Sequence, residues 1–370
     1  MKHNKCLGLK PIFIAVMVLC ALILMPSLFK NFLTKTPESV EVTPLHYDKF
    51  VYEPVLPGKA VSIVKDMNEH TAFHYETWHY RANVKGSDGK DYGVQWLMYR
   101  IANSDNTGVG WKNAQIYTTQ VVVSTAGKSW AQQRIARGGV GQAGVLMDPF
   151  RLWIDNWSWQ SSNNTAAPSR IMVHSDDFSV DLRTASFGPY VLMGDKGYKV
   201  THDLLSKASY QFSAPFLRTK GKLVLNGKTV EVQGLAWIDK EWGNDLVPEK
   251  GFAWDAFSIH LTDGRTLALN QYHQQDQMKY VTGTLAARNG SVINIDNDDI
   301  RLYPLEKVTL LDGRVLPLRW VIEIPKYDIS LITQTMKKEL WLPFWIPSWE
   351  GPIRVTGSQM GVGFMQLTYD

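Results

Sequence analysis

Two carboxylates and two tryptophans lie close together near the middle of the chain, in the segment 234–243. Read as a β-strand, this segment points alternate side chains to opposite faces, so Trp237, Asp239 and Glu241 would share one face. The opposite face would carry the other large side chains, Ile238, Lys240 and Trp242. Two carboxylates at this spacing lie roughly 6–7 Å apart on a strand. Beside an indole and away from bulk water, one of them could keep its proton at neutral pH and act as a general acid.

The same residues also have a purely structural interpretation. The segment could be a bulged strand end, in which both acids accept hydrogen bonds from nearby backbone N–H groups or pair with Lys240. The spacing alone leaves both interpretations open.

Composition limits the classes of protein to consider. The chain has 370 residues, of which 45% are hydrophobic and 12% aromatic, and this length favours two domains. The net charge of +4 comes from scattered Lys and Arg without a basic run among aromatics, so no nucleic-acid partner is expected. Cys6 and Cys20 are the two cysteines, and the rest of the chain therefore lacks a disulfide, a catalytic thiol or a cysteine metal site.

The N-terminal segment carries a membrane or export signal. Residues 11–29 are uncharged, follow three lysines and end at Lys30, and they are long enough to span a bilayer as a helix. No small-x-small cleavage site follows, which favours an uncleaved anchor, with a cleaved signal peptide and a lipoprotein signal as the alternatives. The basic flank predicts a body outside the cytoplasm, either anchored or secreted, and periplasmic in a Gram-negative host.

The segments that must position the central carboxylates are mostly short and alternating. Residues 78–84 and 92–99 flank an Asp-Gly turn and predict a β-hairpin. Further strands are expected at residues 115–123, 152–157, 178–183, 222–225 and 229–232, and short helices at residues 128–137 and 202–207. Many short strands at regular spacing indicate antiparallel barrels or sandwiches, an all-β class.

A weak internal repeat places the domain boundary. The sequence from Trp254 through Asp263-Gly264 to Gln271 is similar to the first hairpin, which suggests two related units. We predict a signal segment at 1–30, a linker at 31–48, and β-domains at 49–245 and 246–370. Asp239 and Glu241 would then close the first unit and face the second, and ligand sites are common at such junctions.

Histidines gather near the start of the first unit, at positions 70, 74 and 79, with Glu69 and Glu76 nearby. Their spacing fits no metal site, so no metal and no other cofactor is expected. Surface or pocket-lining roles suit these histidines better.

Several motifs together resemble the family of carotenoid 1,2-hydratase (hydroxyneurosporene synthase) and AttH-like proteins. The segment 234–243 resembles the signature Gly-Leu-Ala-Trp-Met-Asp-His-Glu-Trp-Gly. Four further blocks resemble family motifs in the same order: His70 to Trp78, Pro149 to Ser158, Trp254 to Ser258, and Trp349 to Leu367. Lys240 replaces the histidine of the signature, Thr77 replaces a tryptophan, and His79 replaces a tyrosine.

The resemblance implies two tandem lipocalin-like antiparallel β-barrels and an apolar ligand. Members linked to chemistry act on isoprenoid or polyketide-like molecules by adding water or guiding a cyclisation, and others are associated with ABC transport systems. The residues expected to bind the ligand are Glu76, Trp78, His79, Tyr80, Trp237, Trp242, Trp254 and Asp255.

Two functions remain in view. The first is an envelope protein that binds an apolar small molecule, lipid or isoprenoid-like, for an ABC transporter permease, which the N-terminal anchor favours. The second is a hydro-lyase or cyclase acting on an alkene. Asp239 would be its general acid and Glu241 the partner that raises the pKa of Asp239 or directs water. Trp237 and Trp254 would stabilise a developing carbocation through their π-faces.

Overall fold

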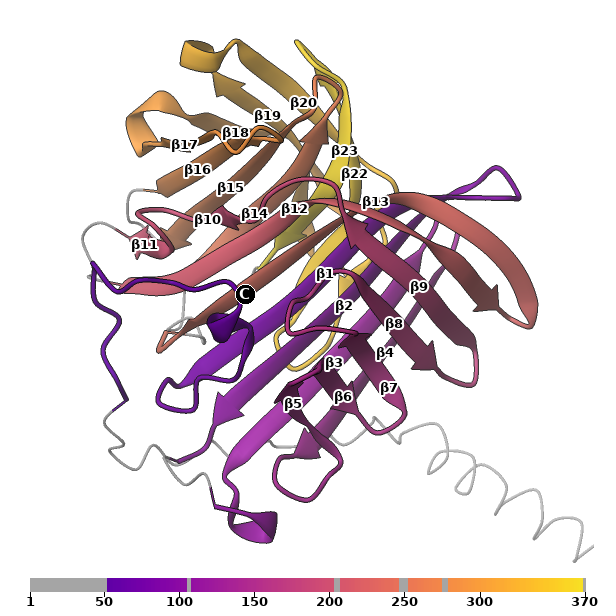
Figure 1. Ribbon diagram of the computed structural model, residues 1–370. Helices are drawn as coiled ribbons and strands as arrows, with labels where there is room; N and C mark the ends of the chain where they lie inside the picture. The colour runs from indigo at the N-terminus through magenta and orange to yellow at the C-terminus, as the bar shows by residue number, and fades with distance from the viewer. Residues whose placement is uncertain (1–51, 105–107, 203–206, 246–251, 275–278, 369–370) are drawn as a thin grey trace, which may run out of the picture. The chain divides into compact units, whose positions relative to one another are not determined.

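The computed structural model describes residues 52–104, 108–202, 207–245, 252–274 and 279–368 (Figure 1). The predicted membrane span at residues 11–29 and the linker after it lie outside these ranges. Within them, none of the helices has the length and hydrophobicity that crossing a bilayer requires. The structure is 64% strand, which confirms the predicted all-β class.

The strands form two antiparallel sheets, one curled into a nearly closed barrel and the other into a half-barrel. Over the described residues, the first sheet has 13 strands and the second has 10. The first sheet contains β1 (Tyr75–Gly86), β2 (Asp91–Ala102), β3 (Gln115–Ser124), β4 (Ser129–Arg137), β5 (Ala143–Met147), β6 (Phe150–Ile154), β7 (Trp157–Ser161), β8 (Ser169–His174), β9 (Phe178–Ser186), β10 (Val191–Leu192), β11 (Tyr198–His202), β12 (Lys207–Leu225) and β13 (Lys228–Gly243).

The second sheet contains β14 (Phe252–Leu261), β15 (Arg265–Gln274), β16 (Tyr280–Ala287), β17 (Val292–Ile295), β18 (Arg301–Thr309), β19 (Val315–Ile324), β20 (Ile329–Thr335), β21 (Trp341–Leu342), β22 (Ser348–Gly357) and β23 (Gly361–Leu367). The helices are four short 3₁₀ turns within the described ranges: η1 (Lys65–Met67), η2 (Gly110–Lys112), η3 (Asn297–Asp299) and η4 (Pro325–Tyr327).

Both sheets are built around an opening hairpin. β1 pairs with β2 and also with β13, the last strand of its sheet. β14 pairs in the same way with β15 and with the closing strand β23. Each hairpin turns at an Asp-Gly pair, and Gly89 and Gly264 have φ angles of 80° and 89° that favour glycine. The predicted internal repeat is therefore confirmed as two equivalent hairpins.

Each sheet encloses its own hydrophobic core. The core of the first sheet contains five tryptophans that are almost wholly buried, Trp78, Trp96, Trp157, Trp159 and Trp242. The core of the second sheet contains Phe257, Trp320 and Trp349 with many aliphatic side chains. Val122 of β3 packs into this second core, so the two sheets are also joined by apolar contact.

Close backbone approach holds the opening hairpin of the first sheet against β22 and β23. A Cβ atom on Gly93 would lie 2.7 Å from Pro352 Cγ, so only glycine fits there without displacing a neighbour. Two side-chain amides of the hairpin reach backbone carbonyls of the second sheet: Asn83 donates to Gly363 O at 3.0 Å, and Gln95 donates to Glu350 O at 3.0 Å. These contacts hold the opening hairpin in one position along β22 and β23.

Two of the predicted elements are wrong. Residues 128–137 do not form a helix, because Ser129–Arg137 pairs along its length with β3 as strand β4. Pairing with a strand already in place overrides the weak local pattern. The predicted strand 152–157 is interrupted at Asp155, whose φ of 50° starts the turn between β6 and β7. The expected helix at 202–207 falls largely outside the described residues.

Candidate functional site

Strand β13 positions the carboxylates as the alternation predicts. Asp239 and Glu241 line a cavity between the two sheets, while Ile238 and Trp242 belong to the core inside the barrel. Trp237 lies on the face of Asp239, in a small cluster that includes Ala268 of the second sheet. One strand therefore separates two environments, a polar junction outside the barrel and the barrel core within it.

The junction cavity has a volume of about 140 Å³. Both sheets contribute to its wall, with aromatic, amide and charged side chains in alternation. The first sheet, with Asp245 just after it, supplies Tyr75, Thr77, His79, Arg81, Leu97, Tyr99, Lys199, Thr201, Lys207, Gln211, Asp239 and Glu241, and the second supplies Trp254, Ala256, Phe257, Ser258, Ala268, Asn270, Tyr272 and Gln366.

Asp239 is surrounded by hydrogen-bond donors. Arg81 Nη1 donates to Oδ2 at 2.5 Å, and Trp237 Nε1 donates to Oδ1 at 2.9 Å. Ser213 donates a short hydrogen bond to the same Oδ1. Burial would raise the pKa of Asp239, but Arg81 and these donors outweigh it, and the net pKa lies below the ordinary value. The lowered pKa favours the ionised form of Asp239, whereas general-acid catalysis at this position would need a raised pKa.

Glu241 is held by a different set of partners. Ser209 Oγ donates to Glu241 Oε1 at 2.6 Å, Tyr75 OH donates to it at 3.4 Å, and Lys199 Nζ lies 3.7 Å away. The buried hydroxyl of Tyr75 has a pKa well above its usual value, because burial and the nearby Glu241 carboxylate both disfavour the phenolate. This end of the cavity offers hydroxyl groups and one compensated ion pair.

Arg81 links the two sheets electrostatically. Besides Asp239 of β13, its guanidinium contacts Glu350 of β22 through Nε at 3.1 Å and Ser258 of β14 through Nη1 at 3.3 Å. His79 Nε2 lies 3.0 Å from the same Glu350 oxygen. Burial would raise the pKa of Glu350, but His79 and Arg81 lower it overall. The cluster of Arg81, Asp239, Glu350 and His79, here called the junction cluster, is a buried connection in which one guanidinium is shared by two carboxylates.

A second ionic cluster lies inside the first barrel. Glu76 is fully buried and accepts short hydrogen bonds from Arg100 and from Lys240. His70 Nδ1 lies 3.1 Å from Glu76, and its ring stacks on Trp242 at 4.2 Å between centroids. Burial lowers the pKa of Lys240 to about 8, although Glu76 acts in the opposite direction. The lysine that replaces the family's histidine thus forms part of a closed ionic core.

The structure divides the sequence-predicted site residues between the barrel interior and the junction cavity. Trp78 and Tyr80 lie in the same core: the ring of Trp78 lies 3.6 Å from Lys240 Nζ, and the hydroxyl of Tyr80 bonds to Thr184 and Thr219. Of the eight residues expected to bind ligand, His79 and Trp254 line the junction cavity. Four others project to the inner face of the barrel: Glu76, Trp78, Tyr80 and Trp242.

Asp255 occupies a third environment, since its neighbours Trp254 and Ala256 line the cavity while Asp255 itself projects to the other face of β14. Gln271 Nε2 donates to Asp255 Oδ2 at 2.8 Å, and His273 Nε2 lies 3.3 Å from that oxygen. The other carboxylate oxygen, Oδ1, is buried and has no hydrogen-bond partner among the described residues.

Arg81 and Glu350 are further site residues that the sequence did not single out. Arg81 follows His79 at the two-residue spacing of a shared strand face, a signal that was available in the sequence. Glu350 lies within a family-like motif, but nothing local connects it to Arg81, since 269 residues separate the two.

The two curved antiparallel sheets, packed over a polar junction, define a two-unit, lipocalin-like β-protein. The AttH-like family profile matches residues 54–369, and the chain belongs to this family. A crystal structure described as an AttH candidate from Nitrosomonas europaea is 25% identical, with a TM-score of 0.76, and the match covers 85% of this chain and 98% of that one.

A second solved structure, kievitone hydratase from Nectria haematococca, is 14% identical, with a TM-score of 0.63. That match covers 87% of this chain and 99% of the other, and it shows a shared fold. The search of curated proteins gives no match.

Proposed function

We propose that the protein binds a largely apolar small molecule with one polar end, and that this end enters the junction cavity. The observation that carries the proposal is a cavity between the sheets whose charged groups are already compensated by one another. Such a site can accept hydrogen bonds from a ligand or donate them without moving a proton.

The wall chemistry suits an amphipathic ligand. Tyr75 and Tyr272 offer hydroxyl groups, while Trp254 and Leu97 offer apolar surface. The volume of about 140 Å³ is smaller than a typical pocket for a whole drug-sized molecule, so the ligand would insert one end and extend outward. An ordinary lipid or isoprenoid alcohol has this form.

Binding is favoured over general-acid catalysis at Asp239. Hydration of an alkene begins with a proton delivered to carbon, which needs an acid that is protonated at the working pH. Arg81 and the other donors keep Asp239 ionised. The proposal has three further parts. The protein would be attached to the membrane through residues 11–29, lie outside the cytoplasm and cooperate with an ABC transporter permease. Their support is the uncharged N-terminal segment and the family resemblance.

The test is native mass spectrometry of the full chain, purified in detergent from its own host, with extraction of the bound molecule. We expect an unmodified apolar molecule bound one to one, and lower occupancy in Trp254→Ala. Trp111→Ala is the matched control, since Trp111 is 75% exposed and lies outside the cavity lining. Equal occupancy in both variants would place the ligand elsewhere and contradict the proposal.

Alkene hydration is the second candidate, and Asp255 is the observation that favours it. Its buried Oδ1 has no hydrogen-bond partner among the described residues, whereas both oxygens of Asp239 accept hydrogen bonds. A hydratase with the same fold shows that the fold can host such chemistry. Growth in ¹⁸O-labelled water separates the two candidates: an extracted ligand with a labelled hydroxyl group, lost in Asp255→Asn, would support hydration, and an unlabelled ligand would support binding alone.

A further inference from the structure

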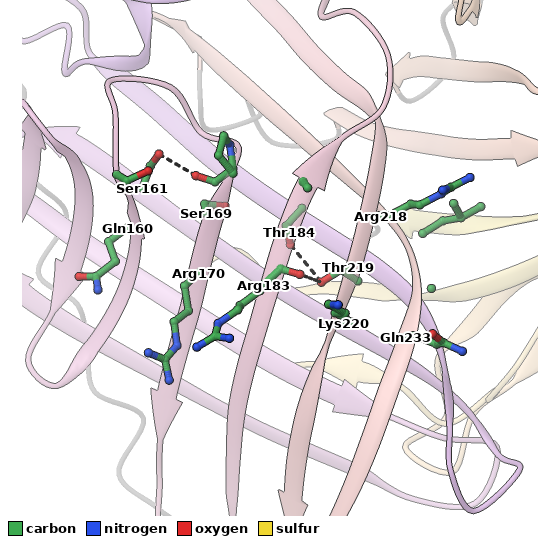
Figure 2. Close-up of a pocket in the computed structure, with 15 residues that line it drawn as sticks. Gln160, Ser161, Ser169, Arg170, Arg183, Thr184, Arg218, Thr219, Lys220 and Gln233 are labelled. Carbon is green, nitrogen blue, oxygen red and sulfur yellow. Dashed lines mark hydrogen bonds between the residues drawn. The ribbon is translucent and has the colours of Figure 1, made fainter.

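A row of cations crosses the outer face of the first sheet, away from the junction cavity. Arg170 of β8, Arg183 of β9 and Lys220 of β12 are directly opposed in the antiparallel register, so their side chains project from one face. Figure 2 shows these side chains extending into the same groove. We call these three residues the cationic row.

The register also extends the polar character on both sides. Gln160 of β7 is opposed to Arg170, and Gln233 of β13 is opposed to Lys220. Arg218, two residues before Lys220, projects from the same face of β12. Like charges directly opposed across strands destabilise a sheet unless an opposite charge lies nearby. An anion bound beside these side chains would therefore stabilise this part of the sheet.

The carboxylate of Asp181 neutralises one end of the cationic row. Arg170 donates to both oxygens of Asp181, at 2.7 and 2.8 Å. Arg183 and Lys220 are exposed and form no ion pair within the described residues, although Asp181 exerts some attraction on Arg183. Two residues further along β12, the charge of Lys222 is compensated, because Lys222 is directly opposed to Asp181 of β9 and to Glu231 of β13.

The cationic row lies in a groove of about 920 Å³. Its lining includes no carboxylate, but it has hydroxyl groups from Ser161 and Ser169 and apolar surface from Pro168, Ala185 and Leu235. This volume is within the range of small-molecule sites and far larger than one inorganic anion needs. The lining thus combines cationic, hydroxyl and apolar surface in one concavity.

We propose that this groove binds a phosphate-bearing amphiphile. The phosphate would lie between Arg183 and Lys220, because guanidinium and ammonium groups are the usual protein partners of phosphate oxygens. Arg218 would add a third positive charge, and the apolar chain would lie along Leu235 and Ala185. This site is separate from the junction cavity, and its occupancy does not depend on the function proposed for that cavity.

The test uses the full chain and three probes in calorimetric titrations: lysophosphatidic acid, glycerol 3-phosphate and lysophosphatidylcholine. We expect lysophosphatidic acid to bind most tightly. Arg183→Gln and Lys220→Gln should each raise its Kd by about tenfold or more, since each removes a charge-assisted hydrogen bond to phosphate. Trp254→Ala, at the junction cavity, should leave this Kd unchanged.

The matched control is Lys222→Gln, which removes the same charge from the same face of the same strand. Its Kd should change by less than about threefold, because Asp181 and Glu231 already compensate Lys222. Failure of lysophosphatidic acid to bind, or an equal loss in Lys222→Gln, would overturn the proposal. Equal affinity for glycerol 3-phosphate would refute the role of the apolar chain, and equal affinity for lysophosphatidylcholine would refute selection of a net anion. The substituted positions are exposed, so circular dichroism spectra should stay unchanged.

Discussion

Replacing Arg81 by methionine should destabilise the folded protein by about 3–5 kcal/mol at neutral pH. The guanidinium pairs with two buried carboxylates, Asp239 at 2.5 Å and Glu350 at 3.1 Å, and methionine keeps much of its volume without its charge. Both carboxylates would then be buried without their strongest cation. This loss of stability is the usual cost of removing one partner of a buried ion pair. Removing one partner of an exposed ion pair costs far less.

The effect should depend on pH with a definite sign. In the wild type the pKa of Asp239 and that of Glu350 are lowered, so these groups stabilise the fold above their unfolded pKa near 4 and lose that contribution as the pH falls through their folded values. In Arg81→Met, burial should raise both pKa values. The charged forms then cost stability at neutral pH, and protonation relieves this cost by up to about 1.4 kcal/mol per pH unit for each carboxylate. The gap between wild type and variant should therefore narrow from pH 7 to pH 4.

Urea unfolding, followed by tryptophan fluorescence at several pH values, measures this gap. Arg170→Met is the matched control, because Arg170 also pairs with an aspartate, but at side-chain exposures of 39% and 28%. Its cost should be below about 1 kcal/mol and nearly independent of pH. A loss below about 1 kcal/mol for Arg81→Met at pH 7, or a gap that does not narrow on acidification, would refute the reasoning.

Three further predictions concern the barrel interior and the contact between sheets. Glu76→Gln should lower the free energy of unfolding, measured in urea, by about 3–5 kcal/mol, because it leaves the ammonium of Lys240 buried without its carboxylate. A smaller loss of stability than in Lys240→Met would contradict this. Lys240 has a folded pKa of about 8 against 10.5 for the free group, so the unfolded chain binds more protons between these values. Stability relative to Lys240→Met should therefore rise across that window, and a parallel pH dependence of the two proteins would exclude the shifted pKa. Gly93→Ala should lower stability by about 1–3 kcal/mol through its clash with Pro352, whereas Gly127→Ala, which meets no atom within 4 Å, should change stability by less than about 0.5 kcal/mol.

Much of the local structure could be predicted from the sequence, because it depends on near neighbours. The two-residue period of a β-strand over 234–243 predicted Asp239 and Glu241 on one face and Trp242 on the other, as the structure has them. The Asp-Gly turns predicted both opening hairpins and their similarity. Strand periodicity and turn chemistry are short-range properties, so a single sequence carries them.

The charge state and the partners of the site depended on tertiary structure. Arg81, Asp239 and Glu350 come from three strands that are far apart in the sequence, and only the packing of the sheets brings them together. That contact reverses the pKa shift that burial alone predicts for Asp239. The pairing of Lys240 with Glu76 across β1 and β13 likewise holds these two residues inside the barrel, away from the junction cavity. Electrostatic compensation is a long-range property of the assembled sheets, and the order of residues along one strand does not determine it.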